Sequence, residues 1–177
     1  MRNLNIFIFT FFIVSSCEVV EGPYQNEINS NGSSETVLQK ILIEDFTGHT
    51  CRNCPEAAIE LKSIKELYPN QVIGIALHVG NAFAIPYPPN SSNKYLTDFR
   101  TKWGEEIDNY FGVSSVGLPK GMINRKDEEP KSKDDWGNVA YEMINNSPLF
   151  DIDISASPFV FGNCDIEVLV KALENLN

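Results

Sequence analysis

One short stretch constrains the fold more than any other: an apolar run that ends at a glycine and is followed by a C-x-x-C pair. Residues 37–46 are rich in apolar and β-branched side chains, which predicts a buried strand. Gly48 breaks the run, and Cys51 and Cys54 follow it. Residues 55–68 carry apolar side chains at helical spacing. The cysteine pair is therefore expected between the end of a strand and the start of a helix.

This position favours thiol chemistry. A helix N-terminus carries a positive partial charge and free N–H groups, which favour a thiolate over a thiol. C-x-x-C spacing also brings two sulfurs close enough for a disulfide that can open again. Cys51 is the candidate nucleophile and Cys54 the resolving thiol, with Arg52 and His49 placed to lower the pKa of Cys51 by charge. The alternative is a static Cys51–Cys54 disulfide that only holds the start of the helix.

The composition of the chain excludes several classes of function. Its 177 residues, 42% of them hydrophobic, suffice for one domain and part of another. A net charge of −10 makes it a poor ligand for nucleic acid or for anionic lipid. The sequence has no glycine-rich phosphate loop, no Ser-His-Asp set and no carboxylate pair at helical spacing, so hydrolysis has no support and no cofactor is expected.

The first residues have the pattern of a targeting signal. A basic start and an apolar run too short to span a bilayer lead to two serines and Cys17, so residues 1–16 are expected to be a signal peptide. The small residues before Cys17 resemble a bacterial lipobox, which implies an acylated Cys17 that anchors the protein to a membrane. An ordinary secretory signal with a chance cysteine is the alternative. Residues 17–36 are polar and are expected to be a flexible tether.

The rest of the chain alternates between strand and helix patterns. A second apolar strand at 71–79 completes a strand–helix–strand unit, which predicts two parallel strands. The elements expected after it are a loop at 81–93, a helix at 95–110, a short strand that begins after Pro119, a charged loop at 125–133 and a helix from Ser132 or Asp134 to about 146.

Three features together resemble the thioredoxin superfamily over residues 37–146: the strand–C-x-x-C–helix unit, Asp45 six residues before Cys51, and a Gly112-Val113 to Leu118-Pro119 motif before a short strand. The resemblance implies an α/β fold with a central mixed sheet flanked by helices. It also implies a cis Pro119 that packs against the cysteines and a buried Asp45 that accepts the proton of Cys54.

The sequence departs from that family at several positions. Thr50 stands where a tryptophan precedes the first cysteine, and Arg52-Asn53 replaces the usual Gly-Pro between the cysteines. No convincing last hairpin strand is visible between 125 and 134. These departures concern the redox potential and the substrate rather than the fold.

A closer resemblance is to the outer membrane protein 28-related lipoproteins of Gram-negative bacteria, through the stretch F-T-G-H-T-C-R-N-C-P at 46–55. It implies a lipid-anchored protein of the cell envelope, in the outer membrane, and a β-sandwich after the thioredoxin-like domain. Residues 148–177 alternate apolar and polar, which predicts strands. The expected domains are therefore a thioredoxin-like domain at 37–147 and, at 148–177, the first strands of a truncated sandwich.

The main functional hypothesis is thiol–disulfide exchange on envelope proteins, with two alternatives. The first alternative is a surface binding module with a structural disulfide, in which the loop at 82–93 forms a recognition edge beside the cysteines. The second is a metal site made of Cys51, Cys54, His49 and His78, although a single C-x-x-C is weak evidence for zinc. Cys164 is expected to be a small buried hydrophobe.

Overall fold

A computed structural model of the chain describes residues 37–90 and 94–174. The expected signal peptide, the lipid attachment at Cys17 and the tether all lie outside the described residues. Among the described residues, no helix has the length and apolar character needed to cross a bilayer.

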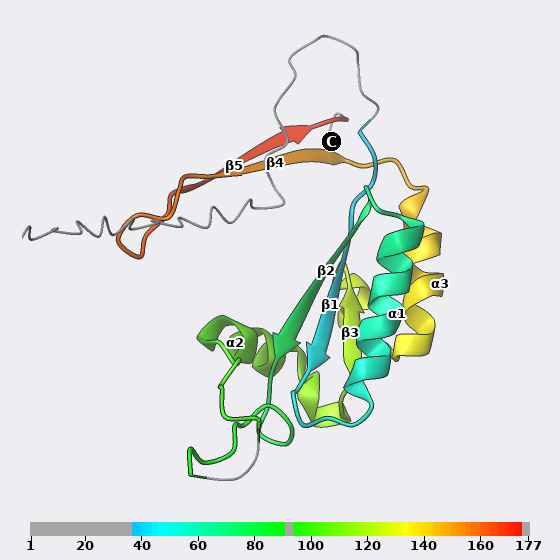
Figure 1. Ribbon diagram of the computed structural model, residues 1–177. Helices are drawn as coiled ribbons and strands as arrows, with labels where there is room; N and C mark the ends of the chain where they lie inside the picture. Colours follow the sequence, from blue (N-terminus) through cyan, green and yellow to red (C-terminus); the bar gives the residue numbers. More distant parts are fainter. Residues whose placement is uncertain (1–36, 91–93, 175–177) are drawn as a thin grey trace, which may run out of the picture. The chain divides into compact units, whose positions relative to one another are not determined.

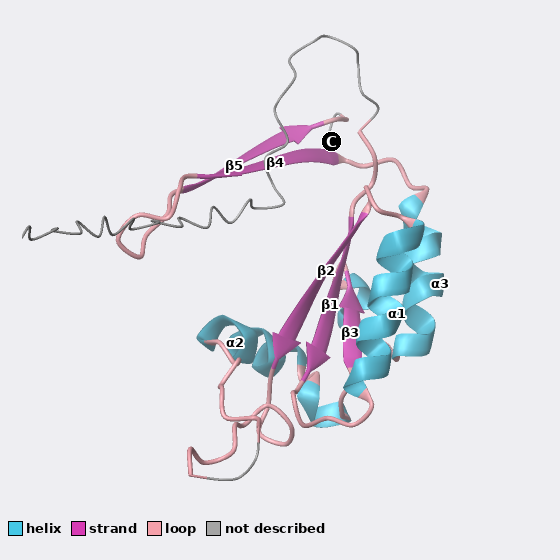
Figure 2. Cartoon of the chain, viewed as in Figure 1, coloured by secondary structure: helices cyan, strands magenta, loops and turns pink. Residues whose placement is uncertain are grey.

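The first part of the described chain is a three-stranded mixed sheet in the order β2-β1-β3, with helices on both faces (Figure 1). The central strand β1 pairs in parallel with β2 and antiparallel with β3. Helices α1 and α3 cover one face and α2 the other (Figure 2). The elements are β1 (Ile41–Thr47), α1 (Cys54–Leu67), β2 (Val72–His78), α2 (Lys102–Phe111), β3 (Lys120–Ile123) and α3 (Lys133–Ile144). This arrangement confirms an α/β fold with a parallel strand–helix–strand unit.

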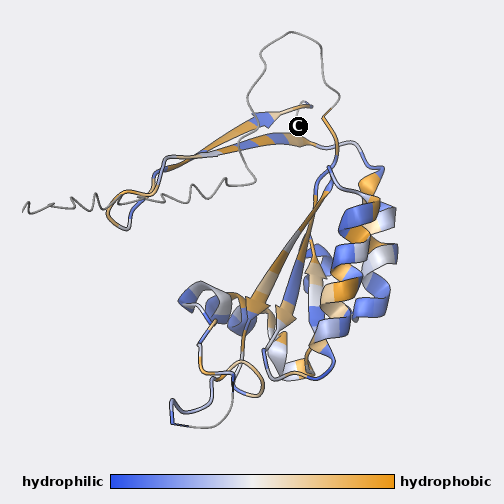
Figure 3. Cartoon of the chain, viewed as in Figure 1, coloured by the Kyte–Doolittle hydropathy of each residue, from blue (hydrophilic) through white to orange (hydrophobic). Residues whose placement is uncertain are grey.

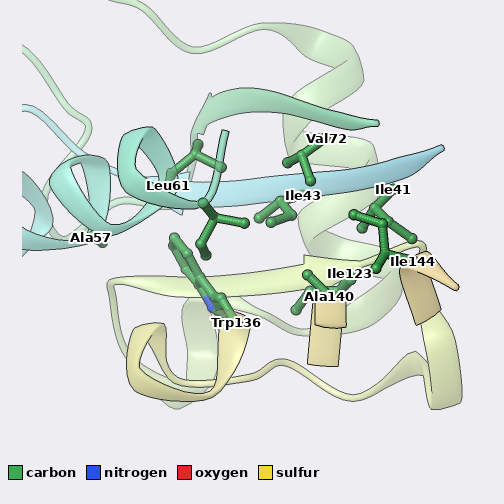
Figure 4. Close-up of a cluster of buried hydrophobic side chains, with 10 residues drawn as sticks. Ile41, Ile43, Ala57, Leu61, Val72, Ile123, Trp136, Ala140 and Ile144 are labelled. Atoms are coloured by element: carbon green, nitrogen blue, oxygen red, sulfur yellow. The ribbon is translucent and has the colours of Figure 1, made fainter. Parts of the chain in front are cut away.

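The larger core lies between the sheet and the pair α1 and α3. Alternate residues of β1 point toward it, because successive strand residues face opposite sides of a sheet. Trp136 of α3 is fully buried there, and its Nε1–H donates to the carbonyl of Lys131 at 3.2 Å. Full burial of one such side chain contributes about 1.5–3 kcal/mol. The cluster of Figure 4 consists of Ile41, Ile43, Ala57, Leu61, Ile64, Val72, Ile123, Trp136, Ala140 and Ile144.

A smaller core on the α2 face contains a buried carboxylate that is paired with a partly exposed arginine. Phe46, Val113 and Met122 are fully buried on this side of the sheet. Glu44 of β1 is also buried, and it accepts two hydrogen bonds from Arg125, from Nε at 2.8 Å and from Nη2 at 2.6 Å. The bidentate geometry compensates for part of the desolvation of the carboxylate. It also ties the chain after β3 to the central strand.

Helix α2 begins later than the sequence predicts. A helix was expected from residue 95, but α2 starts at Lys102 with Thr101 as its N-cap, whose Oγ1 accepts from the N–H of Gly104 at 3.0 Å. The Asp98 side chain accepts from both the backbone N–H and the guanidinium of Arg100. Such local side-chain hydrogen bonds compete with helical ones. The segment before α2 therefore stays non-helical despite its apolar pattern.

The charged segment after β3 forms no further strand, as expected. Residues 126–128 make a 3-10 turn, and Lys131 forms only an isolated antiparallel bridge with Gly121. The expected helix that follows is confirmed by α3, with Ser132 at its N-cap position.

The tail is a β-hairpin of β4 (Phe150–Ala156) and β5 (Ile166–Ala172), which confirms the expected strands. Hydrophobic and hydrophilic residues alternate along most of β4, whereas β5 has three consecutive apolar residues at 168–170 (Figure 3). Apolar side chains such as Ile154 and Val168 are exposed at 70% and 54%. The prediction that Cys164 is buried is wrong: it is a free, partly exposed thiol in the connection between the two strands, close to a Val160–Asn163 bridge. A β-sandwich remains a prediction.

The Glu44–Arg125 pair gives the first test of the fold. Arg125→Met should destabilise the protein by about 2–3 kcal/mol, because it leaves the Glu44 carboxylate buried without a partner. Urea unfolding measures the loss, and the double variant Glu44→Leu/Arg125→Met should recover most of it. Lys62→Met is the control, since its pair with Glu66 is exposed and worth little. Equal stability of wild type and Arg125→Met would contradict the assignment.

Candidate functional site

The two cysteines form a disulfide at the start of α1. Their Cα atoms are 5.4 Å apart. The helix begins at Cys54, one residue before the expected start, with Asn53 at the N-cap and Pro55 in the first turn. Cys51 and Cys54 are exposed at only 7% and 5%. The disulfide therefore lies at the positive end of the α1 dipole with a narrow accessible edge.

The turn that carries Cys51 is held by two sets of hydrogen bonds. The Cys51 N–H donates to the carbonyl of Gly48 at 3.0 Å. The backbone N–H and the hydroxyl of Thr50 both donate to the carbonyl of Phe83, at 3.1 and 3.0 Å. A Cβ on Gly48 would lie 2.6 Å from the Phe83 backbone, so this close approach requires glycine. The loop after β2 is thus fixed beside the cysteine turn, as the sequence suggested.

Asp45 is buried, as expected. It is 2% exposed on β1, and its Oδ1 has no hydrogen-bond partner among the described residues. Strand alternation places it with Ile41 and Ile43 on the sheet face that α1 covers. Burial raises the pKa of Asp45 from 3.8 to about 6. The site therefore contains a carboxyl group that titrates close to neutral pH.

The peptide bond between Leu118 and Pro119 is cis, which confirms that part of the expectation. The strand that follows, β3, places Gly121 opposite Asp45 on β1. The packing of Pro119 against the cysteines stays a prediction.

A cluster of aromatic side chains surrounds the two histidines. The ring centroids of His49 and His78 lie 5.8 Å apart, and His49 stacks on Tyr95 at 5.5 Å. Phe99 contacts both histidine rings, at 6.0 and 5.2 Å, and Tyr87 contacts Tyr95 at 6.4 Å. Sequence reasoning missed Tyr95 and Phe99 because it assigned them to a helix. The sequence feature that could have identified them is the density of aromatic residues before α2.

The histidines carry unpartnered nitrogen atoms. Nδ1 and Nε2 of His49 and Nδ1 of His78 are buried and accept or donate no hydrogen bond within the described part of the chain. In the same described ranges, no three His, Cys, Asp or Glu side chains are placed to hold a metal ion. Cys51 and Cys54 are bonded to each other, so the four-ligand metal site considered above is wrong for this oxidised form.

Comparisons with known proteins add little. No protein-family model matches the chain. No curated protein matches it. Among solved structures, it is similar to the crystal structure of an Agrobacterium tumefaciens protein from a structural genomics programme, at 16% identity and a TM-score of 0.46. The match covers 76% of this chain and 58% of that one, so the chain spans less than two thirds of that protein's length.

The raised pKa of Asp45 predicts an unusual dependence of stability on pH. Because the folded state holds the proton more tightly, folding loses stability as pH rises from about 4 to 6, by about 3 kcal/mol in total. Asp45→Asn should therefore stabilise the oxidised protein by about 2–3 kcal/mol at pH 7.5 and hardly at all at pH 3.5.

Urea unfolding at the two pH values measures this difference. Asp153→Asn, at an exposed position of β4, is the matched control and should show no pH-dependent gain. A gain from Asp45→Asn that is the same at both pH values would contradict the raised pKa.

Proposed function

We propose that the protein catalyses thiol–disulfide exchange on proteins of the cell envelope, with a thioredoxin-like domain at 37–147. The observation that carries this proposal is the juxtaposition of the Cys51–Cys54 disulfide, in the first turn of α1, with the buried carboxyl group of Asp45 on the sheet face that α1 covers. The parallel unit of β1, α1 and β2 and the position of Pro119 before β3 agree with the thioredoxin-like assignment.

The chemistry follows from the two sulfurs. In the reduced form, the Cys51 thiolate attacks one sulfur of a substrate disulfide, and the other substrate sulfur leaves as a thiolate. Cys54 then loses its proton and attacks the Cys51 sulfur, which releases the second substrate thiol and reforms the Cys51–Cys54 bond. Two electrons pass from the protein to the substrate. The reverse sequence oxidises a substrate dithiol.

Asp45 serves as the acceptor of the Cys54 proton in this scheme. With a pKa of about 6 it is mostly ionised at neutral pH, yet more basic than an ordinary aspartate. The α1 dipole and the exposed Arg52 stabilise the Cys51 thiolate. A lower thiol pKa gives a larger fraction of thiolate but makes that thiolate a weaker nucleophile. These charges therefore set a balance between the amount of thiolate and its reactivity.

The second candidate function is a binding module without turnover. It is favoured by the exposed aromatic side chains beside the cysteine turn: Phe83, Tyr87, Tyr95 and Phe99 are 38–56% exposed. Large aromatic groups of this kind supply much of the contact energy of protein interfaces. In this case the disulfide would only hold the turn in place.

The reduction potential of the Cys51–Cys54 pair separates the two functions. Exchange predicts a potential of roughly −270 to −120 mV, whereas a structural disulfide lies below about −300 mV. Cys54→Ser should trap mixed disulfides with envelope proteins through Cys51, and Cys51→Ser should trap none.

Both trapping variants are made in a Cys164→Ser background, because Cys164 is a free and partly exposed thiol. A strongly negative potential together with no trapped partner would reject exchange in favour of the binding module.

The proposed location is the outer membrane, with the anchor at Cys17. Expression in a Gram-negative host with labelled palmitate should give a labelled wild-type protein and an unlabelled Cys17→Ser variant, since the acyl chains attach to this residue. Cys164→Ser is the control and should label like the wild type. Equal labelling of Cys17→Ser and wild type would rule out this anchor.

A further inference from the structure

The His49–His78 pair has buried nitrogen atoms without partners in the described structure. Three ring nitrogens are in this condition, in a cluster lined by Tyr95 and Phe99. Leaving a buried polar group unpaired costs about 1–3 kcal/mol, so such groups call for an explanation other than packing. Apolar side chains would fill the same space more favourably. The imidazoles therefore point to a role that needs their ability to bind protons.

The position of the pair connects it to the disulfide. His49 is two residues before Cys51, so the Cα atoms of His49 and Cys51 are at most about 7 Å apart. Both residues belong to the turn in which the Cys51 N–H donates to the carbonyl of Gly48. His78 ends β2 next to Thr47 of β1, on the face of the sheet that α1 covers. Both imidazoles thus belong to the end of the sheet from which the cysteine turn projects.

We propose that His49 and His78 form an imidazole pair that gains positive charge when the Cys51–Cys54 disulfide is reduced, and so makes the redox equilibrium of this site depend on pH. The two imidazoles are positioning residues for the Cys51 thiolate. The inference rests on the exchange function proposed above. It requires only one part of that function, namely that the disulfide can be reduced.

In the oxidised form, the surroundings of the pair disfavour a positive charge on His78. Burial and the nearby His49 lower the pKa of His78, and Asp98 acts in the opposite direction. Arg100 holds the pKa of Asp98 at about 2, so this carboxylate stays ionised. The ring centroids are 5.8 Å apart, so a positive charge on one imidazole disfavours a positive charge on the other.

Reduction changes this balance by creating an anion. When a substrate dithiol reduces the site, the Cys51–Cys54 bond breaks and the substrate disulfide forms. The dithiol releases two protons: one goes to Cys54 and the other to the imidazole pair, while Cys51 remains a thiolate. The negative sulfur offsets the repulsion between the imidazoles, so both bind protons more tightly in the reduced state.

Other titratable and charged groups face the same region and must be controlled. The segment before α2 contributes Tyr87, Tyr95, Asp98 and Arg100. Glu105 of α2 accepts a hydrogen bond from the N–H of Gly80, which lies two residues after His78. The remaining groups are Arg52 of the cysteine turn and Asp45 of β1. Asp45 titrates near pH 6 and would add its own pH dependence. The decisive measurements therefore use an Asp45→Asn background.

Imidazole NMR gives the first readout. The sequence contains only two histidines, so the variants His49→Gln and His78→Gln assign both resonances. In the full chain, the titration midpoints should rise by roughly half to one pH unit when the disulfide is reduced with a phosphine, with EDTA present to exclude metal binding. In each single variant, the remaining histidine of the oxidised form should titrate higher than in the parent.

The redox equilibrium gives the second readout. At pH 6, His49→Gln should disfavour reduction by glutathione about three- to tenfold in the equilibrium constant, because the thiolate loses a cationic neighbour. At pH 8.5, about two units above the ordinary pKa of an imidazole, the two proteins should agree. Lys62→Gln, an exposed charge change on α1, should match the parent at both pH values.

Unchanged imidazole midpoints on reduction, or the same pH dependence for His49→Gln and its parent, would overturn the proposal even if partners are trapped through Cys51. If instead no partner is trapped and glutathione fails to reduce the disulfide, while the phosphine-reduced protein shows the raised midpoints, the exchange function fails and the proposed response of the imidazole pair stands.

Discussion

Strand β1 is the element on which the rest of the fold depends, because it is paired on both edges and covered on both faces. Its parallel partner β2 and its antiparallel partner β3 are far apart in sequence, and both helix layers pack on it. All of the last five residues of β1, 43–47, are buried. A strand in this position has little freedom to shift register, since a one-residue slip would exchange its two faces. The cysteine turn begins where this fixed strand ends.

Two acidic residues of β1 are buried in the central strand, and their desolvation is compensated in different ways. Glu44 and Asp45 are adjacent and therefore face opposite sides of the sheet. Glu44 is compensated by the two hydrogen bonds from Arg125. Asp45 has no such partner for Oδ1 and has a raised pKa instead. An uncompensated carboxyl group in the central strand lowers stability at neutral pH, and this is the basis of the role proposed for Asp45.

The sequence predicted those parts of the fold that depend on local pattern. The order of strands and helices, the parallel pairing of β1 and β2, the buried Asp45 and the cis bond before Pro119 follow from periodicity, from spacing or from the family resemblance. The start of α2 could not be predicted in this way, because the hydrogen bonds between the side chains of Asp98 and Arg100, which compete with helix formation, leave no periodic signal in the sequence. The exposure of Cys164 was missed because this residue lies in the connection between β4 and β5, where no periodic pattern indicates burial.

The histidine cluster is the part of the site that sequence alone could least provide. His49 follows β1 and His78 ends β2, so only the parallel pairing of these strands brings them to the same end of the sheet. Tyr95 and Phe99 reach them from a segment whose conformation was itself unexpected. Asp45 and His78 lie on the same sheet face, and the cysteine turn with His49 follows the end of β1. The proposed coupling between proton and electron transfer therefore depends on how the fold brings these groups to one end of the sheet, rather than on any single residue.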